Sequence, residues 1–399
     1  GRCITPAVEP PPAPRTPKGV RTPAIRKAPD GDEEGPVPGI GLCLSGGGYR
    51  AMLFHVGSLW RLNQAGYLPK LDRISSVSGG SITAAVLASR WGELNLGDKG
   101  KADDKTFEKV VAKPLKDFAG RTIDVPAVLL GTLLPGVTIN GRLARSYRTL
   151  FGARTLRDLP SRPEFVFDAT SLQSGDLWRF SSSTEGDWRV GTRQAPDTDL
   201  AHVVAASSAF PPVLSPARFS FPAGALKGGG DDQVNSPPYT TKVVLSDGGV
   251  YDNLGLEAVW SRFKQVLISD AGGHMGNAPS PSSFWPLQVL RVLNVIDNQV
   301  RDLRKRQAVV SFIDGRRTGA YFGIRSHVRD FGLKDPIATP SDEAVNALAG
   351  ISTRLSSLNP QVQERLINWG YVICDTALRA HVDTAQSPGS LPYGAAGLG

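Results

Sequence analysis

Two short elements about 170 residues apart are suited to chemistry if they act together. In each, an apolar run typical of a buried strand ends at a polar residue, Ser78 in the first and Asp247 in the second. A hydroxyl held on a sharp turn can attack a carbonyl carbon, and a neighbouring carboxylate can accept its proton. We therefore predict that Ser78 is a nucleophile and Asp247 its base. Two glycines after each residue let the backbone turn: Gly79, Gly80, Gly248 and Gly249.

A glycine-rich segment upstream of the serine is suited to binding an anion. Gly46, Gly47 and Gly48 follow an apolar run and offer consecutive amides that no side chain obstructs. Arg50 adds a permanent cation nearby. Such donors stabilise the oxyanion that forms when a serine attacks an ester, and losing one typically slows the reaction by about 10²–10³-fold. We predict that these four residues form an oxyanion hole.

The same segment also fits a nucleotide-binding pattern. Gly46, Gly48 and Ala51 match the G-x-G-x-x-[GA] fingerprint, which expects an acidic residue at the end of the next strand. The nearest acidic residue, Asp72, precedes that strand instead, and the sequence has no G-x-x-x-x-G-K-[ST] loop. A nucleotide-binding module is therefore an alternative for which the glycines are present but the acidic residue at the end of the second strand is missing.

A histidine base is a second alternative. His274 and His327 follow Asp247, and the order Ser, Asp, His is that of an α/β-hydrolase triad. His274 is the better placed of the two, because it directly follows the glycine turn at residues 270–273. A third alternative keeps the fold without the chemistry and makes the chain a non-catalytic lipid-binding module.

The elements that must position these residues alternate between strand and helix. Apolar runs that end at glycine turns are followed by apolar residues at helical spacing, as at residues 50–62 and 82–89. This alternation predicts an α/β fold, a three-layer α/β/α sandwich with a mainly parallel central sheet, whose site lies at the carboxyl ends of the strands. The predicted strands are residues 40–44, 74–77, 165–170, 177–180, 242–245 and 265–269.

The two ends of the chain differ in composition from its middle. Residues 1–38 contain ten prolines and few apolar side chains, which predicts a disordered tail. Residues 386–399 are rich in Gly, Pro and Ala, and we expect a flexible C-terminal tail. Residues 39–385 form one predicted domain with a helical insertion at about 107–159. Because the chain begins with Gly1, nothing before it can be read.

Charge and hydropathy narrow the choice of partner. The 399 residues carry a net charge of +8, which favours anionic partners such as lipid head groups. Arginines flank the apolar residues 125–134, which we interpret as an interfacial lid. No stretch approaches the roughly 18 apolar residues that a spanning helix requires. We expect a soluble protein with at most peripheral contact with an anionic membrane, and no nucleic-acid partner.

The cysteines indicate a reducing compartment. Cys3, Cys43 and Cys374 are odd in number and far apart, with no C-x-x-C pair, which argues against a disulfide framework and against a zinc site. We expect a cytoplasmic protein with no metal and no cofactor. Cys43 and Cys374 have apolar neighbours and are predicted to be buried.

Three motifs follow one another along the chain: Ser45-Gly46-Gly47-Gly48-Tyr49-Arg50, Ser78-Gly79-Gly80 and Asp247-Gly248-Gly249. Their combination and order resemble the patatin-like phospholipases, and the likeness covers about residues 39–382. Residues 206–212 and 251–255 are similar to segments that flank the motifs of that family.

The resemblance implies a lipid acyl hydrolase that cleaves phospholipids or related lipid esters through an acyl-enzyme, without calcium. It implies that Ser78 and Asp247 form a catalytic dyad and that the Gly46–Gly48 amides and Arg50 surround the oxyanion. The chain departs from the family pattern at three positions. The family often has Asp where this chain has Ser45 and Gly where it has Ala51, and it usually has Gly where this chain has Ser76. These departures concern loop geometry, and so the efficiency and substrate range of the reaction.

Overall fold

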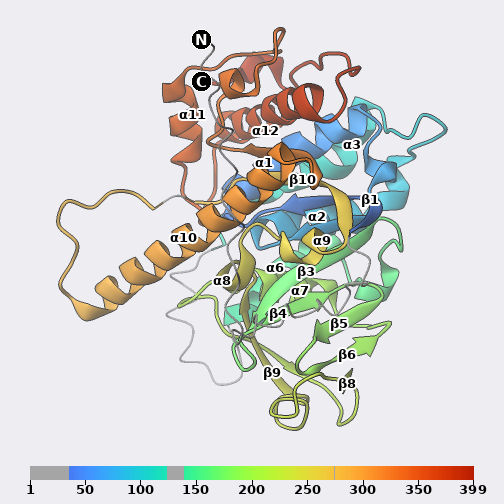
Figure 1. The fold of residues 1–399 in the computed structure, drawn as a ribbon, viewed down its shortest axis with the longest axis vertical. Helices are drawn as coiled ribbons and strands as arrows, with labels where there is room; N and C mark the ends of the chain where they lie inside the picture. Colours follow the sequence, from blue (N-terminus) through green and yellow to red (C-terminus); the bar gives the residue numbers. More distant parts are fainter. Residues whose placement is uncertain (1–35, 124–138, 274) are drawn as a thin grey trace, which may run out of the picture.

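The computed structural model describes residues 36–123, 139–273 and 275–399, and within them eleven strands form one sheet (Figure 1). The sheet order is β11-β10-β1-β2-β3-β4-β5-β6-β8, and β9 pairs with both β3 and β7. The strands are β1 (Val37–Leu44), β2 (Arg73–Ser76), β3 (Glu164–Ser171), β4 (Leu177–Phe180), β5 (Thr184–Asp187), β6 (Gly191–Gln194), β7 (Ala217–Ser220), β8 (Lys227–Gly228), β9 (Lys242–Asp247), β10 (Phe263–Asp270) and β11 (Thr318–Gly323).

Helices cover both faces of the sheet, as the alternation of side chains along β1 requires. Leu42 and Leu44 belong to a large core with α1, α2 and α12, whereas Cys43, between them, packs on the other face with α9 and α10. The predicted α/β/α sandwich is therefore confirmed. The α-helices are α1 (Gly48–Gln64), α2 (Gly79–Ser89), α3 (Asp104–Phe107), α4 (Lys113–Ala119), α6 (Ile139–Phe151), α7 (Leu200–Ser207), α8 (Gly249–Asp252), α9 (Glu257–Trp260), α10 (Trp285–Ile313), α11 (Asp342–Ala349) and α12 (Pro360–His381).

The sheet has a parallel part and an antiparallel part. Strands β11, β10, β1, β2 and β3 run parallel to their neighbours, as a strand-helix alternation predicts. From β3 onward the remaining strands are antiparallel, and β9 is among them. The sequence predicted a mainly parallel sheet because it did not distinguish the short strands β5 to β8, which lack long apolar runs.

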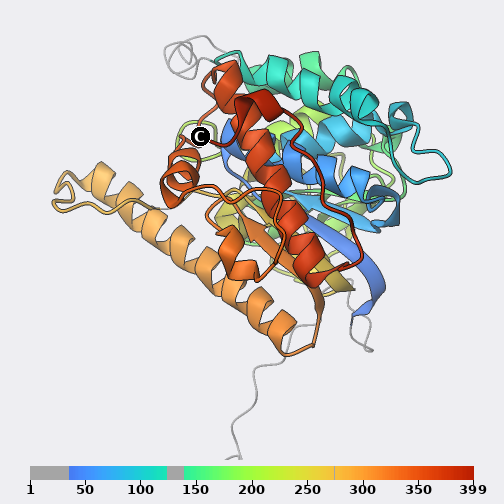
Figure 2. The same ribbon diagram turned by 90° about the horizontal axis from the view of Figure 1, so that it is seen from above.

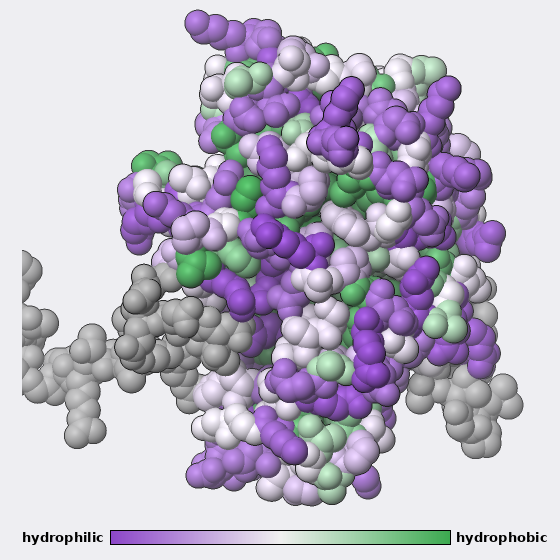
Figure 3. Space-filling model, turned by 90° about the vertical axis from the view of Figure 1, so that its right-hand side faces the viewer, coloured by the Kyte–Doolittle hydropathy of each residue, from purple (hydrophilic) through white to green (hydrophobic). Residues whose placement is uncertain are grey.

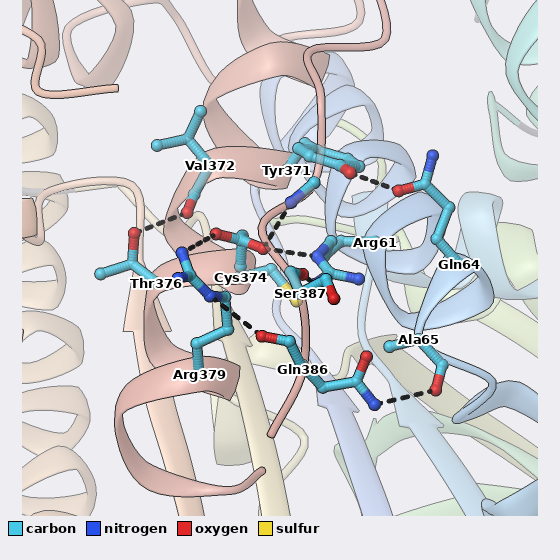
Figure 4. Close-up of polar contacts among 12 residues, drawn as sticks. Arg61, Gln64, Ala65, Tyr371, Val372, Cys374, Thr376, Arg379, Gln386 and Ser387 are labelled. Atoms are coloured by element: carbon cyan, nitrogen blue, oxygen red, sulfur yellow. Dashed lines mark hydrogen bonds and ion pairs between the residues drawn. The ribbon is translucent and has the colours of Figure 1, made fainter. Parts of the chain in front are cut away.

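The C-terminal residues 386–399, predicted to be a flexible tail, are instead packed against α1 and α12. Arg61 of α1 forms a buried ion pair with Asp375 of α12 at 2.6 Å, and Arg61 also donates to the carbonyl oxygen of Ser387 at 2.8 Å (Figure 4). Asn368 donates to the carbonyl oxygens of Tyr393 and Gly397, both at 2.8 Å. The composition of this segment gave no sign of these contacts, because its backbone carbonyl groups make them.

The predicted helical insertion is present in its described parts. α3, a π-helical turn at Glu108–Ala112, α4 and α6 carry buried side chains that join the large core. The apolar residues 125–134, predicted to be a lid, lie outside the described residues, as does the N-terminal tail up to residue 35. β1 begins at Val37, two residues before the predicted start of the domain.

Two further observations concern the cysteines and the membrane. Cys43 and Cys374 are buried free thiols, as predicted. None of the helices in the described ranges is long and apolar enough to cross a bilayer.

Candidate active site

Ser78 lies on a strained turn between β2 and α2. Its φ of 50° and ψ of −116° place a residue with a side chain where glycine is favoured, at a cost of about 1–3 kcal/mol. Ser78 is only partly buried, whereas Ser76, two residues earlier, is fully buried and donates its hydroxyl to the carbonyl oxygen of Val166 at 3.2 Å. Of the two serines, Ser78 is therefore the one whose hydroxyl a substrate can reach.

The glycines after Ser78 bring the upstream glycine segment against it. A Cβ atom added to Gly79 would lie 2.2 Å from the carbonyl oxygen of Gly48, so the backbones of the two turns touch. A Cβ atom on Gly46 would lie 3.2 Å from the Cβ of Ser78. The serine and the glycine segment therefore meet at one point, as expected for neighbouring parallel strands that end at the same edge.

The register of three strands explains how Asp247 reaches Ser78. β2 pairs with the first half of β3, where its last residue, Ser76, lies opposite Phe167. Two residues farther along β3, Ala169 pairs with Asp247, the last residue of β9. β9 thus takes the place beside β3 that β2 leaves when it turns at Ser78, and the ends of the two strands meet. Because β9 is antiparallel, it arrives at this edge from the opposite side.

The Asp247 carboxylate is buried, and only one of its oxygens forms a regular hydrogen bond with the described residues. Its Oδ1 accepts from the backbone N–H of Gly249 at 2.7 Å, while its Oδ2 makes no hydrogen bond of regular geometry among the described residues. Burial raises the pKa of Asp247 to about 7, against the lowering effects of the Gly249 amide and of the Ser78 hydroxyl, with a further increase from the charge of Asp297. The hydroxyl is thus close to the carboxyl, in a contact looser than a regular hydrogen bond.

The hydrogen bonds of the amides around Ser78 differ from those expected for the predicted oxyanion hole. The Gly46 amide donates to the carbonyl oxygen of Asn253 at 3.0 Å and so cannot face an oxyanion. Gly47 and Gly48 begin α1, and their amides donate to no group among the described residues; the same holds for Gly79 at the start of α2. Three amides at two helix N-termini therefore remain for a developing negative charge. The sequence analysis gave Gly79 only a role in the turn, although the residue after a nucleophilic serine commonly donates to the oxyanion.

Arg50, the second residue that differs from the predicted oxyanion hole, uses its guanidinium group elsewhere. Its Nη1 donates to the carbonyl oxygens of Ala349 and Ile351 at 2.7 and 2.8 Å, and its Nη2 donates to that of Ala271 at 2.8 Å. The side chain is 2% exposed, and burial lowers the pKa of Arg50 to about 10. The guanidinium holds the segments after α11 and β10 against α1. It supports the glycine segment from behind and does not face the serine.

A layer of hydroxyl groups supports the site, and the sequence analysis did not assign it. Ser207, the last residue of α7, accepts from the backbone N–H of Ser78 at 3.1 Å and donates to the carbonyl oxygen of Asp168 at 2.7 Å. The buried hydroxyl groups of Tyr147 and Ser208 lie near Asp247, and neither forms a regular hydrogen bond among the described residues. Only the likeness of residues 206–212 to a family segment pointed to this region.

The other predicted glycines have local roles. Gly80 donates to the carbonyl oxygen of Val77 at 2.8 Å and closes the turn at the start of α2. Gly248 donates to the carbonyl oxygen of Ser207 at 3.4 Å, and Gly249 supplies the amide that binds Asp247. The Gly248 amide and the Ser78 amide both donate to Ser207, so the aspartate turn and the serine turn are held at the carboxyl end of α7.

Comparison with known proteins agrees with this arrangement. The sequence model of the patatin-like phospholipase family matches residues 42–260, more than half of the chain, including the serine, the aspartate and all three glycine turns. The chain belongs to the patatin-like phospholipase family. Comparison with curated protein sequences gave no match.

A solved phospholipase structure shares the fold of this chain. Human GIVD cytosolic phospholipase A2 superposes with a TM-score of 0.50 at 13% identity over 85% of this chain and 59% of that chain. VipD from Legionella pneumophila gives a TM-score of 0.36 at 15% identity over 88% of this chain and 68% of that one. This patatin-like chain thus spans 59% of the length of the human protein.

No described histidine of this patatin-like protein contacts Ser78 or Asp247. His55 is buried between Ser45 and Ser269, and burial lowers its pKa to about 4. The other described histidines stack on or pair with distant groups: His202 on Phe219, His327 with Asp342 and His381 with Phe331. The alternative base, His274, lies outside the described residues.

The acidic residue of the nucleotide-binding alternative lies at the wrong end of the sheet. Asp72 accepts from the backbone N–H of Ile40 at 2.9 Å, near the start of β1, and pairs with Arg162 at 2.9 Å. The glycine segment follows Leu44 at the opposite end of the same strand. Asp72 is therefore remote from the place where a nucleotide ribose would bind in such a fold.

The raised pKa of Asp247 predicts the pH dependence of the reaction. A carboxyl group accepts a proton only when it is ionised, so we expect kcat/KM to fall about tenfold per pH unit below pH 7 and to level off above it. An aspartate of ordinary pKa would give a flat profile from about pH 5 upward. Hydrolysis of p-nitrophenyl butyrate between about pH 5 and pH 9 measures this, with circular dichroism at each pH to verify folding. A flat profile would contradict the assignment of Asp247 as the base.

Proposed function

We propose that this patatin-like protein is a lipid acyl hydrolase that cleaves carboxylic ester bonds of phospholipids or related lipids with Ser78 and Asp247. One observation carries the proposal: a partly exposed serine hydroxyl on a strained turn lies beside a buried carboxylate whose second oxygen has no regular hydrogen-bond partner in the described part of the chain. A base with a pKa of about 7 is matched to proton transfer near neutral pH.

The mechanism has two halves. Asp247 accepts the proton of the Ser78 hydroxyl as its oxygen attacks the ester carbonyl carbon, and the amides of Gly47, Gly48 and Gly79 stabilise the oxyanion. The protonated Asp247 then gives its proton to the departing alcohol, which leaves an acyl group on Ser78. In the second half, Asp247 accepts a proton from a water molecule that attacks this ester, and it returns the proton to the Ser78 oxygen as the fatty acid leaves.

Membership of the family supports lipid esters as the substrate class. The activity and substrates of the whole protein are part of the proposal, because the chain spans 59% of the human phospholipase with which it shares a fold. No step of the mechanism above uses a metal ion, so we expect hydrolysis to continue in the presence of a calcium chelator.

Two measurements test the proposal together. A fluorophosphonate probe, which reacts with activated serines, is expected to modify Ser78, as located by mass spectrometry of peptides. Phosphatidylcholine vesicles are expected to yield free fatty acid and lysophospholipid. Lipid binding without labelling or product would indicate a non-catalytic lipid-binding module. Labelling of another serine would refute the assignment of Ser78.

A further inference from the structure

The N-terminal half of α10 extends away from the body of the molecule (Figures 1 and 2). The helix is 29 residues long, and its buried residues, Arg301, Ala308 and Ser311, all lie in its C-terminal half. We call residues 284–296 the outer segment. Its exposed apolar side chains are those of Phe284, Trp285, Leu287, Val289, Leu290, Val292, Leu293, Val295 and Ile296.

These side chains surround the helix instead of forming one stripe. Trp285, Val289 and Ile296 lie on one side at helical spacing, whereas Leu287 and Val295 point in other directions at 100° per residue. The polar residues of the outer segment are Gln288, Arg291 and Asn294. At 100° per residue these three polar residues share one side of the helix with Leu287 and Val295, and the remaining sides are apolar.

The exposure is large for an apolar segment on one element. Trp285 is 70% exposed and Phe284 is 62% exposed. On the face turned to the viewer in Figure 3, apolar residues are scattered among hydrophilic ones. A contiguous apolar surface of this kind marks an interaction site, whereas scattered exposed apolar residues are ordinary.

We propose that the outer segment of α10 is a membrane anchor that lies in the boundary between head groups and acyl chains of one bilayer leaflet. Its thirteen residues are about 20 Å long at 1.5 Å per residue, too short for the roughly 30 Å hydrocarbon core. The loop before it, residues 276–283, is rich in Ser and Pro, and its backbone must stay near water. Phe284 and Trp285, at the junction, are residue types that favour the interface.

The charges of α10 fit an anionic membrane surface. The helix carries five basic residues against two acidic ones, Asp297 and Asp302. Arg301 is buried and Arg304 pairs with Glu257 at 2.9 Å. The basic residues that can face an anionic surface are therefore Arg291, Lys305 and Arg306. Basic residues next to an apolar segment add attraction to anionic lipids. The basic residues are Arg291, Arg301, Arg304, Lys305 and Arg306.

The position of the anchor suits the reaction proposed for Ser78. The docked half of α10 contacts α8, which begins two residues after Asp247, and Arg304 lies 3.6 Å from Asp252 of α8. The outer segment therefore extends from the rim of the site. The choice of a lipid surface as partner rests on the proposed function, and it explains how a buried site gains access to esters that are held in a bilayer.

Vesicle binding tests the anchor independently of catalysis. In Ser78→Ala protein, we expect co-sedimentation with vesicles that contain about one third phosphatidylglycerol. The added pair Leu293→Asp and Ile296→Asp should lower the partition coefficient at least about tenfold, because it places two charges in the acyl boundary. Ile313→Asp is the matched control: it is 78% exposed at the far end of the same helix, and it should bind like the parent.

Activity and oligomeric state complete the test. In protein with Ser78 intact, the Leu293→Asp and Ile296→Asp pair should hydrolyse vesicle lipids poorly and soluble p-nitrophenyl butyrate normally. Normal vesicle binding by the double variant would overturn the proposal that the outer segment is a membrane anchor. An equal loss of vesicle binding in Ile313→Asp protein would also overturn it. Light scattering gives a third outcome that would overturn the anchor: a dimer that dissociates only in the double variant, because the outer segment would then bind a second copy of the chain. Absence of all hydrolysis with intact vesicle binding would overturn the proposed function and leave the anchor.

Discussion

Ser78→Ala protein is expected to hydrolyse p-nitrophenyl butyrate at least about 10⁴-fold more slowly than the parent. The substitution removes the partly exposed hydroxyl at the strained turn between β2 and α2, while Ala keeps the backbone unchanged. Ser76→Ala is the matched control. Ser76 is buried and bonded to Val166, so this variant should retain activity within about tenfold.

The backbone at Ser78 provides a second readout for the same residue. Because a positive φ is costly for any residue except glycine, Ser78→Gly should raise the free energy of unfolding by about 1–3 kcal/mol while it abolishes activity. Urea denaturation measures the gain. Near-parental turnover in Ser78→Ala, or full loss of turnover in Ser76→Ala, would move the nucleophile away from Ser78.

Asp247→Asn protein is expected to lose at least about 10³-fold in kcat, because an amide cannot accept the serine proton. The fold should persist, since the Asn oxygen can still accept from Gly249 and its NH₂ group replaces the oxygen without a regular partner. Steady-state kinetics at about pH 8, where the parent carboxyl is ionised, measures the loss. A small loss would indicate a different base, and His274 would be the first residue to substitute.

The same variant should be more stable than the parent at alkaline pH. Burial raises the folded-state pKa of Asp247 to about 7 from an ordinary value of 3.8, so the folded state binds the proton more tightly than the unfolded state. Stability is therefore lost as the pH rises from about 4 to about 7. Asn does not ionise, so the variant should gain on the order of a few kcal/mol over the parent at pH 8 and little at pH 4. Asp168, whose pKa burial also raises to about 7, is present in both proteins and cancels in the difference.

The positions of the reacting groups along the chain could be predicted from sequence because they depend on local rules. An apolar run that ends at a serine or aspartate followed by glycines predicts a buried strand and a sharp turn, and the structure has both, at Ser78 and at Asp247. Alternation of such strands with helices predicted the α/β/α layers. The family resemblance came from the order of these same motifs, and the family model confirms it.

The partners of individual donors depended on residues far away in the chain. The Gly46 amide is bound by Asn253, and the Arg50 guanidinium is bound by carbonyl groups some 220 and 300 residues later. A glycine segment and a nearby cation look alike in sequence whether or not their hydrogen bonds are already used. The amide of Gly79, which the prediction omitted from the oxyanion hole, donates to no group in the described ranges.

By itself, the sequence determined where the strands before Ser78 and Asp247 end and which family the chain joins, and it predicted which residues can react, because these follow from short-range patterns of burial and turning. Only the tertiary structure decided that antiparallel β9 meets β2 end to end and that the C-terminal segment is packed. It also decided which amides near Ser78 have no partner among the residues it describes. It also decided that the apolar side chains of the outer segment of α10 are exposed. Each of these depends on which distant backbone groups occupy the space beside a residue, and no local pattern records that.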